Sequence, residues 1–188
     1  PQIPVRYANT IPEFKLDDKG LELFSDKTTD GRLINKNNFI GFCPGARHYT
    51  KRWLKEYFIE LGNKLTKAGY TIVLFGGKMD KELCLEISKE IPGSIDASNS
   101  DEILQTAADM KLCKAVVCND SGLMHTAAAV GTKVVAIFGS TVKEFGFTPY
   151  NCKNLILEIK SLKCRPCTHI GRSSCPKKHF KCMKLIKP

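Results

Sequence analysis

A short basic segment at residues 44–53, PGARHYTKRW, is the first candidate site. Three cations fall within six residues of one another: Arg47, Lys51 and Arg52. Gly45 lets a ligand approach the backbone closely, and a helix starting after the segment would add free N–H groups and a positive dipole end. These features predict a diphosphate site contacted by Lys51 or Arg47. The alternative is a solvated basic loop in front of a helix whose first core residue is Trp53. If Lys51 contacts the diphosphate, its loss should still leave the fold intact, because an exposed loop lysine contributes little to stability.

A second candidate site is the segment 119–129, NDSGLMHTAAA, where an apolar run ends in polar residues. Asp120 or Ser121 can cap the helix predicted to follow. The same geometry would place the N–H groups of Ser121 and Gly122 against a phosphate or a sugar. His125 falls on the first turn of that helix, near the same opening. A purely structural role for His125 is the alternative.

A third segment, FGST at residues 138–141, repeats the pattern of an apolar run followed by small polar residues. Thr141 could add a hydroxyl donor to the same anion site. The sequence contains neither G-x-G-x-x-G nor G-x-x-x-x-G-K-[ST], which disfavours a dinucleotide dehydrogenase and a P-loop NTPase. Ser121 also lacks the G-x-S-x-G setting of a hydrolase nucleophile.

Four of the nine cysteines cluster near the end of the chain: Cys164, Cys167, Cys175 and Cys182. Four thiolates can form a tetrahedral zinc site, in which His169 or His179 could replace one thiolate. A redox-labile cluster and packed or disulfide-paired cysteines are the alternatives. The odd total and the scattered remaining cysteines favour a reducing compartment, and therefore the cytosol.

The formal charge of +10 favours anionic partners, which include phosphates, nucleic acid and an acidic membrane surface. Combined with the cysteine cluster, it suggests a zinc-containing, nucleic-acid-binding module as an alternative function. Such modules interleave basic residues with exposed aromatics, whereas Phe180 is the sole aromatic after Tyr150. We therefore expect no nucleic-acid partner.

The elements that must position these segments alternate between short apolar runs and helical periodicity. Strands are expected at 39–43, 71–75, near 95, at 115–118 and 133–138, and helices at about 54–68, 83–91, 103–108 and 123–130. Continuous apolar strands are buried on both faces, which predicts an α/β, Rossmann-like, mostly parallel sheet with helices on both faces. Ligands of such sheets bind beyond the carboxyl ends of the strands, where the three candidate segments lie.

The length of 188 residues suits one domain with attached segments. Residues 1–37 are punctuated by Pro, Gly and Asp, and we expect a linker with one or two short ordered pieces. Residues 38–160 should form the sheet domain. Residues 161–188 should form a cysteine-rich tail packed on its flank.

The three candidate segments and the cysteine-rich tail together resemble the C-terminal half of family 9 glycosyltransferases, the ADP-heptose:lipopolysaccharide heptosyltransferases and their relatives. The resemblance covers about residues 39–187, and its most specific part is DSGLMH at 120–125. Residues 12–16 are similar to the connector from the family's N-terminal domain. The resemblance implies a GT-B enzyme with two facing Rossmann-like domains and the active site between them.

Roles follow from the resemblance, position by position. It implies donor-binding residues in all three segments: Gly45, Arg47, Lys51, Asp120, Ser121, Gly122, His125 and Thr141. Among the residues after the second strand, Asp80 is the candidate for an acidic donor contact. The family's catalytic base is a carboxylate on the N-terminal domain, so no catalytic residue is expected in this chain, which should be inactive alone.

The resemblance also implies the partners and the location. The donor would be ADP-heptose or another nucleotide sugar, and the acceptor a lipopolysaccharide core precursor held by the N-terminal domain. Catalysis inverts the anomeric centre and requires no cofactor. The protein would be cytoplasmic, with peripheral association at the inner face of the inner membrane.

Overall fold

Six parallel strands form one sheet in the computed structural model, which describes residues 1–24, 28, 33 and 37–188. The strands are β1 (Phe39–Cys43), β2 (Thr71–Leu74), β3 (Ile95–Asp96), β4 (Ala115–Asn119), β5 (Val134–Phe138) and β6 (Asn154–Glu158). Their order is β3-β2-β1-β4-β5-β6, the doubly wound order of Rossmann folds. The prediction of a parallel α/β sheet is confirmed.

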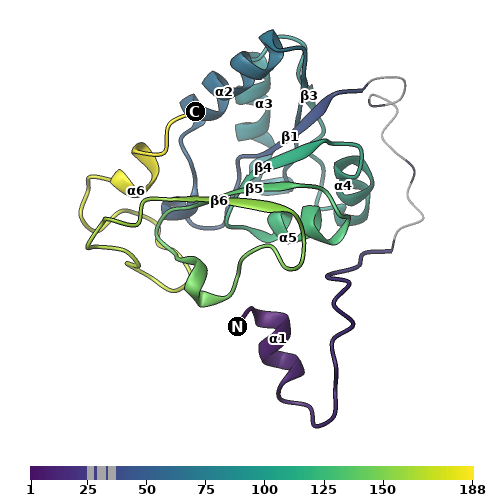
Figure 1. Ribbon diagram of the computed structural model, residues 1–188. Coiled ribbons are helices and arrows are strands. Elements are labelled where there is room, and N and C mark those ends of the chain that lie inside the picture. The colour runs from purple at the N-terminus through teal and green to yellow at the C-terminus, as the bar shows by residue number, and fades with distance from the viewer. Residues whose placement is uncertain (25–27, 29–32, 34–36) are drawn as a thin grey trace.

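Helices cover both faces of this sheet (Figure 1). The α-helices are α1 (Ile3–Ala8), α2 (Lys55–Lys67), α3 (Lys81–Lys89), α4 (Ile103–Met110), α5 (Gly122–Ala129) and α6 (Lys181–Lys184). Short 3-10 helices in the described loops are η2 (Tyr49–Lys51), η3 (Lys78–Asp80) and η4 (Lys143–Phe145). The boundaries differ from the expected ones by a few residues, as usual for frayed ends.

The two sides of the sheet receive alternate residues of each strand, because side chains in a strand point to opposite faces. Val116 of β4 packs with Met110 and Met124 of α4 and α5 in one core cluster. Val117, the next residue, packs with Phe58 of α2 in the other. Burial on both faces explains why the strands are apolar without interruption.

The order of the strands reverses at β1 and β4, which lie side by side at the centre of the sheet. Their ends are in register, with Cys43 opposite Cys118. The segments that follow the two strands therefore leave the same edge of the sheet at its switch point, the usual place for a ligand. The adjacency of β5 brings the third candidate segment to the same edge.

Strand β6 was not predicted from the sequence. It lies at the edge of the sheet, paired with β5 alone, and Leu155 is 56% exposed. An edge strand with an exposed apolar residue lacks the continuous burial that marks the central strands.

The segments outside the sheet domain pack against it at several points. In the segment expected to be a linker, the backbone N–H of Ile3 in α1 donates to the carbonyl of Gly146 at 3.1 Å. Residues 25–27, 29–32 and 34–36 of the same segment lie outside the described residues. In the tail, Phe180 and Met183 are buried in the core cluster that also contains Phe58. Among the described residues, none of the helices has the length and apolar composition to cross a membrane.

Candidate functional site

Asn119, the last residue of β4, ties the first candidate segment to the second. It is fully buried; its side-chain amide donates to the carbonyl of Pro44 at 2.8 Å, and its Oδ1 accepts from the backbone N–H of Trp53 at 2.9 Å. Both ends of the basic loop are thereby fixed to the end of β4. Sequence reasoning missed this role, although a polar residue at the end of a buried strand is a usable signal.

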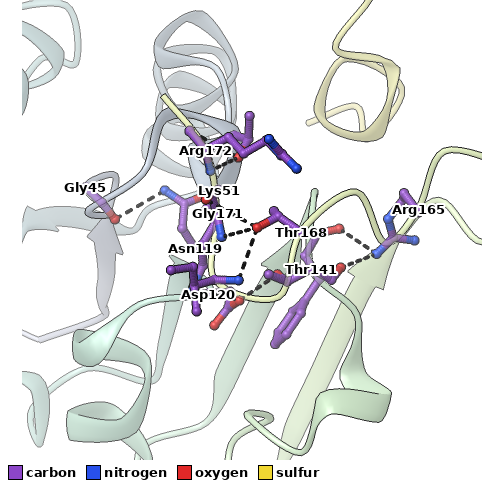
Figure 2. A network of polar contacts seen from close by, with 12 residues as sticks. Gly45, Lys51, Asn119, Asp120, Thr141, Arg165, Thr168, Gly171 and Arg172 are labelled. Carbon is purple, nitrogen blue, oxygen red and sulfur yellow. Dashed lines mark hydrogen bonds and ion pairs between the residues drawn. The ribbon is translucent and has the colours of Figure 1, made fainter. Parts of the chain in front are cut away.

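Lys51, Asp120 and Thr141 meet at the edge of the sheet, one from each candidate segment (Figure 2). The ammonium of Lys51 lies 2.9 Å from Oδ2 of Asp120, to which the Thr141 hydroxyl donates at 2.6 Å. The Lys51 and Asp120 side chains are 16% and 6% exposed. The expectation of an exposed, dispensable Lys51 is wrong, because its charge compensates a buried carboxylate.

The other two cations of the basic segment have different surroundings. Arg47 is exposed at the mouth of the site. Arg52 donates through Nε to the carbonyl of Ala46 at 2.7 Å and so closes the loop on itself. The structure therefore leaves Arg47 available to a ligand, whereas Arg52 stabilises the loop.

The start of α5 offers hydrogen-bond donors without protein partners. Ser121 occupies the N-cap position, but its side chain makes no capping bond. Its hydroxyl is buried and has no hydrogen-bond partner among the described residues. The first N–H groups of a helix also lack intrahelical partners, and the dipole favours an anion there. The Ser121 hydroxyl therefore does not serve as a helix cap.

Two adjoining cavities open at this helix start and share Arg47, Ser121 and Gly122. The smaller, of about 360 Å³, is lined by Arg47, His48, Lys51, Asp120, Ser121, Gly122, His125, Phe147, His169 and Ile170. The larger, of about 850 Å³, is lined by Gly45, Ala46, Arg47, Arg52, Gly77, Met79, Asp80, Asp101, Ile103, Ser121, Gly122, Leu123 and Thr126. Seven of the eight predicted donor-binding residues line one or both cavities, and Thr141 lies behind them against Asp120.

Gly45 and Asp80 lie against each other in the larger cavity. A Cβ atom on Gly45 would stand 2.2 Å from the Asp80 carboxyl carbon, so a larger residue at position 45 would displace the Asp80 side chain. Asp101, in the same wall, accepts from the backbone N–H of Lys78 at 2.9 Å. The cavity thus combines two carboxylates with the apolar side chains of Met79 and Ile103.

Histidines distinguish the smaller cavity. Burial lowers the pKa of His125, while Asp120 opposes this shift and Lys51 adds to it. Sequence reasoning missed His48 and considered His169 as a zinc ligand; the structure places both in the cavity wall. The His169 ring packs against the rings of Phe145 and Phe147, with centroids 4.6 and 5.8 Å away.

Arg165, from the tail, holds the third candidate segment in place. Its guanidinium donates to the carbonyl of Thr141 at 2.8 Å (Figure 2). It also donates to the carbonyl of Gly139 at 2.5 Å and pairs with Glu158 at 3.0 Å. Both charged side chains are almost fully buried, at 4% and 5% exposure. Arg165 therefore fixes the backbone that carries the Thr141 hydroxyl to Asp120.

The four tail cysteines are free thiols. Burial raises the pKa of Cys182 to about 11, and the nearby thiols of Cys167 and Cys175 add to this shift. The sulfur of Cys164 lies 3.8 Å from Nε2 of His179. Within the part of the chain that the structure describes, no group of three or more His, Cys, Asp or Glu side chains is arranged to hold a metal ion. The zinc site stays a prediction.

Comparisons with known proteins agree on one family. The family model described as glycosyltransferase family 9 (heptosyltransferase) matches residues 3–178. Lipooligosaccharide heptosyltransferase 2 of Campylobacter jejuni is 35% identical over 162 residues, covering 83% of this chain and 49% of that protein. The chain therefore spans about half the length of this curated relative.

Solved structures agree with this result. A glycosyl transferase of family 9 from Veillonella parvula matches with a TM-score of 0.66 and 27% identity, over 80% of this chain and 42% of that one. The ADP-heptose LPS heptosyltransferase II of E. coli matches with a TM-score of 0.59 and 30% identity, over 80% and 46%. These matches do not support the nucleic-acid-binding alternative.

Proposed function

This chain belongs to glycosyltransferase family 9, and on that premise we propose that it binds a nucleotide sugar, ADP-heptose, through its diphosphate at the start of α5. The unpartnered, buried Ser121 hydroxyl at the junction of the two cavities carries this proposal. A buried hydroxyl without a partner is costly, and a phosphate oxygen would satisfy it. The free N–H groups of α5 and its dipole would hold the same anion.

The two cavities differ in chemistry in a way that fits the two ends of a nucleotide sugar. The larger cavity offers apolar surface from Met79 and Ile103 for a base and the carboxylates of Asp80 and Asp101 as acceptors for ribose hydroxyls. The smaller offers imidazole and charged groups, which suit the many hydroxyls of a sugar. We assign the nucleoside to the larger cavity and the glycosyl group to the smaller.

The reaction that this arrangement serves is transfer of heptose to a lipopolysaccharide core acceptor. Negative charge develops on the leaving diphosphate as the glycosidic bond breaks. Arg47, Lys51 and the N-terminus of α5 would stabilise that charge, and such preorganised electrostatic contacts are a large part of catalysis in many enzymes. No cofactor is needed for this role, and zinc in the tail would be structural.

Residues 38–160 would then form the donor-binding domain, and residues 161–188 a tail packed on it. The acceptor is a membrane lipid precursor, so we place the reaction at the cytoplasmic face of the inner membrane. The net charge of +10 supports peripheral association with that acidic surface.

Calorimetric titration with ADP, UDP, GDP and ADP-heptose tests the proposal directly. We expect ADP and ADP-heptose to bind and to protect the protein against thermal unfolding. Absence of heat and protection with all four at millimolar concentration would remove the donor-site assignment.

Two serines provide a matched pair of variants. The hydroxyls of Ser121 and Ser140 are both buried without a partner, but Ser140 does not line either cavity. Ser121→Ala should weaken ADP binding roughly tenfold or more by removing a hydrogen bond to a charged group, whereas Ser140→Ala should leave it unchanged. Neither change should destabilise the fold, since each removes an unsatisfied polar atom. Equal ADP affinities for the two variants would contradict the assignment.

A further inference from the structure

The cysteine-rich tail reaches into the smaller cavity. His169 and Ile170 line its wall, opposite residues that come from the basic loop and from α5. Ile170 is 63% exposed and belongs to neither core cluster of the described residues. The tail is therefore part of the site's wall as well as of the core.

The loop that carries these two residues, Thr168–Arg172, is held in a fixed shape. The Thr168 hydroxyl accepts from the backbone N–H groups of Ile170 and Gly171, at 3.3 and 3.1 Å. The N–H of Arg172 donates to the Thr50 hydroxyl at 2.8 Å, and the Thr50 N–H donates to the carbonyl of Arg172 at 3.1 Å (Figure 2). These bonds attach the tail loop to the basic loop.

Gly171 permits this close attachment. Its φ of +119° is a conformation that L-residues with a side chain rarely adopt, and an added Cβ would lie 2.5 Å from the Cβ of His48. Because Gly171 lets the tail loop approach His48 closely, the two residues before it, His169 and Ile170, are held at the cavity in one geometry. A wall that is ordered before a ligand arrives costs little entropy on binding.

The wall has the chemistry of a sugar site next to a phosphate site. His48, His125 and His169 supply imidazole nitrogens that can donate to or accept from hydroxyls. Phe147 and Ile170 supply apolar surface for the carbon face of a sugar ring and exclude water from it. The start of α5, where the phosphate is proposed to bind, lines the same cavity through Ser121 and Gly122.

We propose that the tail loop Thr168–Arg172 is a specificity element: His169 and Ile170 contact the glycosyl group of the nucleotide sugar and not its nucleotide. The inference rests on the proposed function, because it needs the sugar to occupy the smaller cavity. It assigns to the cysteine-rich tail a recognition role beyond packing.

The test compares ADP with ADP-heptose on the same variants by calorimetric titration. His169→Phe keeps an aromatic ring between Phe145 and Phe147 but removes the imidazole nitrogens, and Ile170→Ala removes the exposed apolar contact. Each should weaken ADP-heptose binding roughly five- to tenfold, the effect of about one neutral hydrogen bond or one apolar contact. ADP affinity should stay within about twofold.

Leu185→Ala is the matched control, since Leu185 is also an exposed apolar residue of the tail, at 51%, and does not line the cavity. Both affinities should be unchanged in this variant. If the unaltered protein binds neither ligand, the proposed function fails. In another outcome, the unaltered protein binds both ligands while the His169 and Ile170 variants keep parental affinity for both, or lose as much affinity for ADP as for ADP-heptose. In either case the donor site stands and the role of the tail loop is refuted.

Discussion

The ion pair between Lys51 and Asp120 makes the sharpest prediction about the site. Lys51→Met keeps most of the aliphatic stem but leaves the Asp120 carboxylate, 6% exposed, without its countercharge. Removing one partner of a buried pair costs roughly 3–5 kcal/mol of stability. We expect about 3 kcal/mol, the lower end of that range, because Thr141 still donates to Asp120 and Lys51 is itself 16% exposed.

The same variant should lose ligand affinity for two reasons. Lys51 lines the smaller cavity, and losing a charge-assisted contact with a phosphate costs roughly 1.5–3 kcal/mol, or about ten- to over a hundredfold in affinity. The uncompensated Asp120 would in addition repel the anion. Adding Asp120→Asn removes both charges, so stability should return to within about 1 kcal/mol of the parent and affinity should recover in part.

Thermal and denaturant unfolding measure the first effect, and calorimetric titration with ADP and ADP-heptose measures the second. For a chain of this size, about 3 kcal/mol corresponds to a fall in Tm of roughly 6–12 °C. Lys51→Met with unchanged Tm would refute the ion-pair argument. A folded Lys51→Met that binds both ligands with parental affinity would refute the site assignment itself.

Three other predictions concern the surroundings of the site. Arg165→Met should destabilise the protein by roughly 3–5 kcal/mol in denaturant unfolding, because Glu158 is left buried and unpaired. Adding Glu158→Gln should restore part of the loss, since the carbonyls of Gly139 and Thr141 still lack the guanidinium donor. The folded-state pKa of His125 lies below its ordinary value of 6.5, so the unfolded chain binds the proton more readily. The free energy of unfolding should therefore fall as the pH drops below about 6.5, and it should fall less in His125→Gln. Denaturant unfolding at several pH values measures this difference. If the four tail cysteines coordinate zinc, metal analysis of protein purified without chelator should find about one zinc per chain, whereas four freely titratable thiols would contradict the zinc site.

The sequence predicted the part of the site that depends on the backbone alone. Continuous apolar strands imply a parallel sheet, and such a sheet gathers the segments after its strands at one edge. Local patterns such as glycine before a basic run, or a polar strand end before a small-residue helix, mark which segments to choose. Gly45, Ser121 and Gly122 could be assigned in this way without any knowledge of side-chain contacts.

Side-chain pairings could not be predicted, because they join residues far apart in the chain. Nothing local to Lys51 shows that its partner is Asp120, or that Arg165 reaches back to the carbonyl of Thr141. The same holds for His169, whose position in the wall depends on how the tail folds over the sheet edge. The spaced cysteines predict a metal site, but no local pattern marks residues 169–170 between them as part of the cavity wall.

The pairings also describe how the cations nearest the site are used. Lys51 is committed to Asp120, Arg52 to the carbonyl of Ala46, and Arg165 to Glu158. A surface that binds nucleic acid gains affinity from many exposed cations, each releasing counterions.

Of the four cations named at this site, Arg47 is exposed, Lys51 pairs with Asp120 and also lines the smaller cavity, and Arg52 and Arg165 stabilise the protein itself. Besides Arg47 and Lys51, recognition of an anion would therefore use neutral donors, the Ser121 hydroxyl and the first N–H groups of α5. Neutral donors at fixed positions select for the shape of a compact phosphate group more than for charge in general. Such a site is suited to a single diphosphate, and its selectivity does not follow from the net charge of the chain.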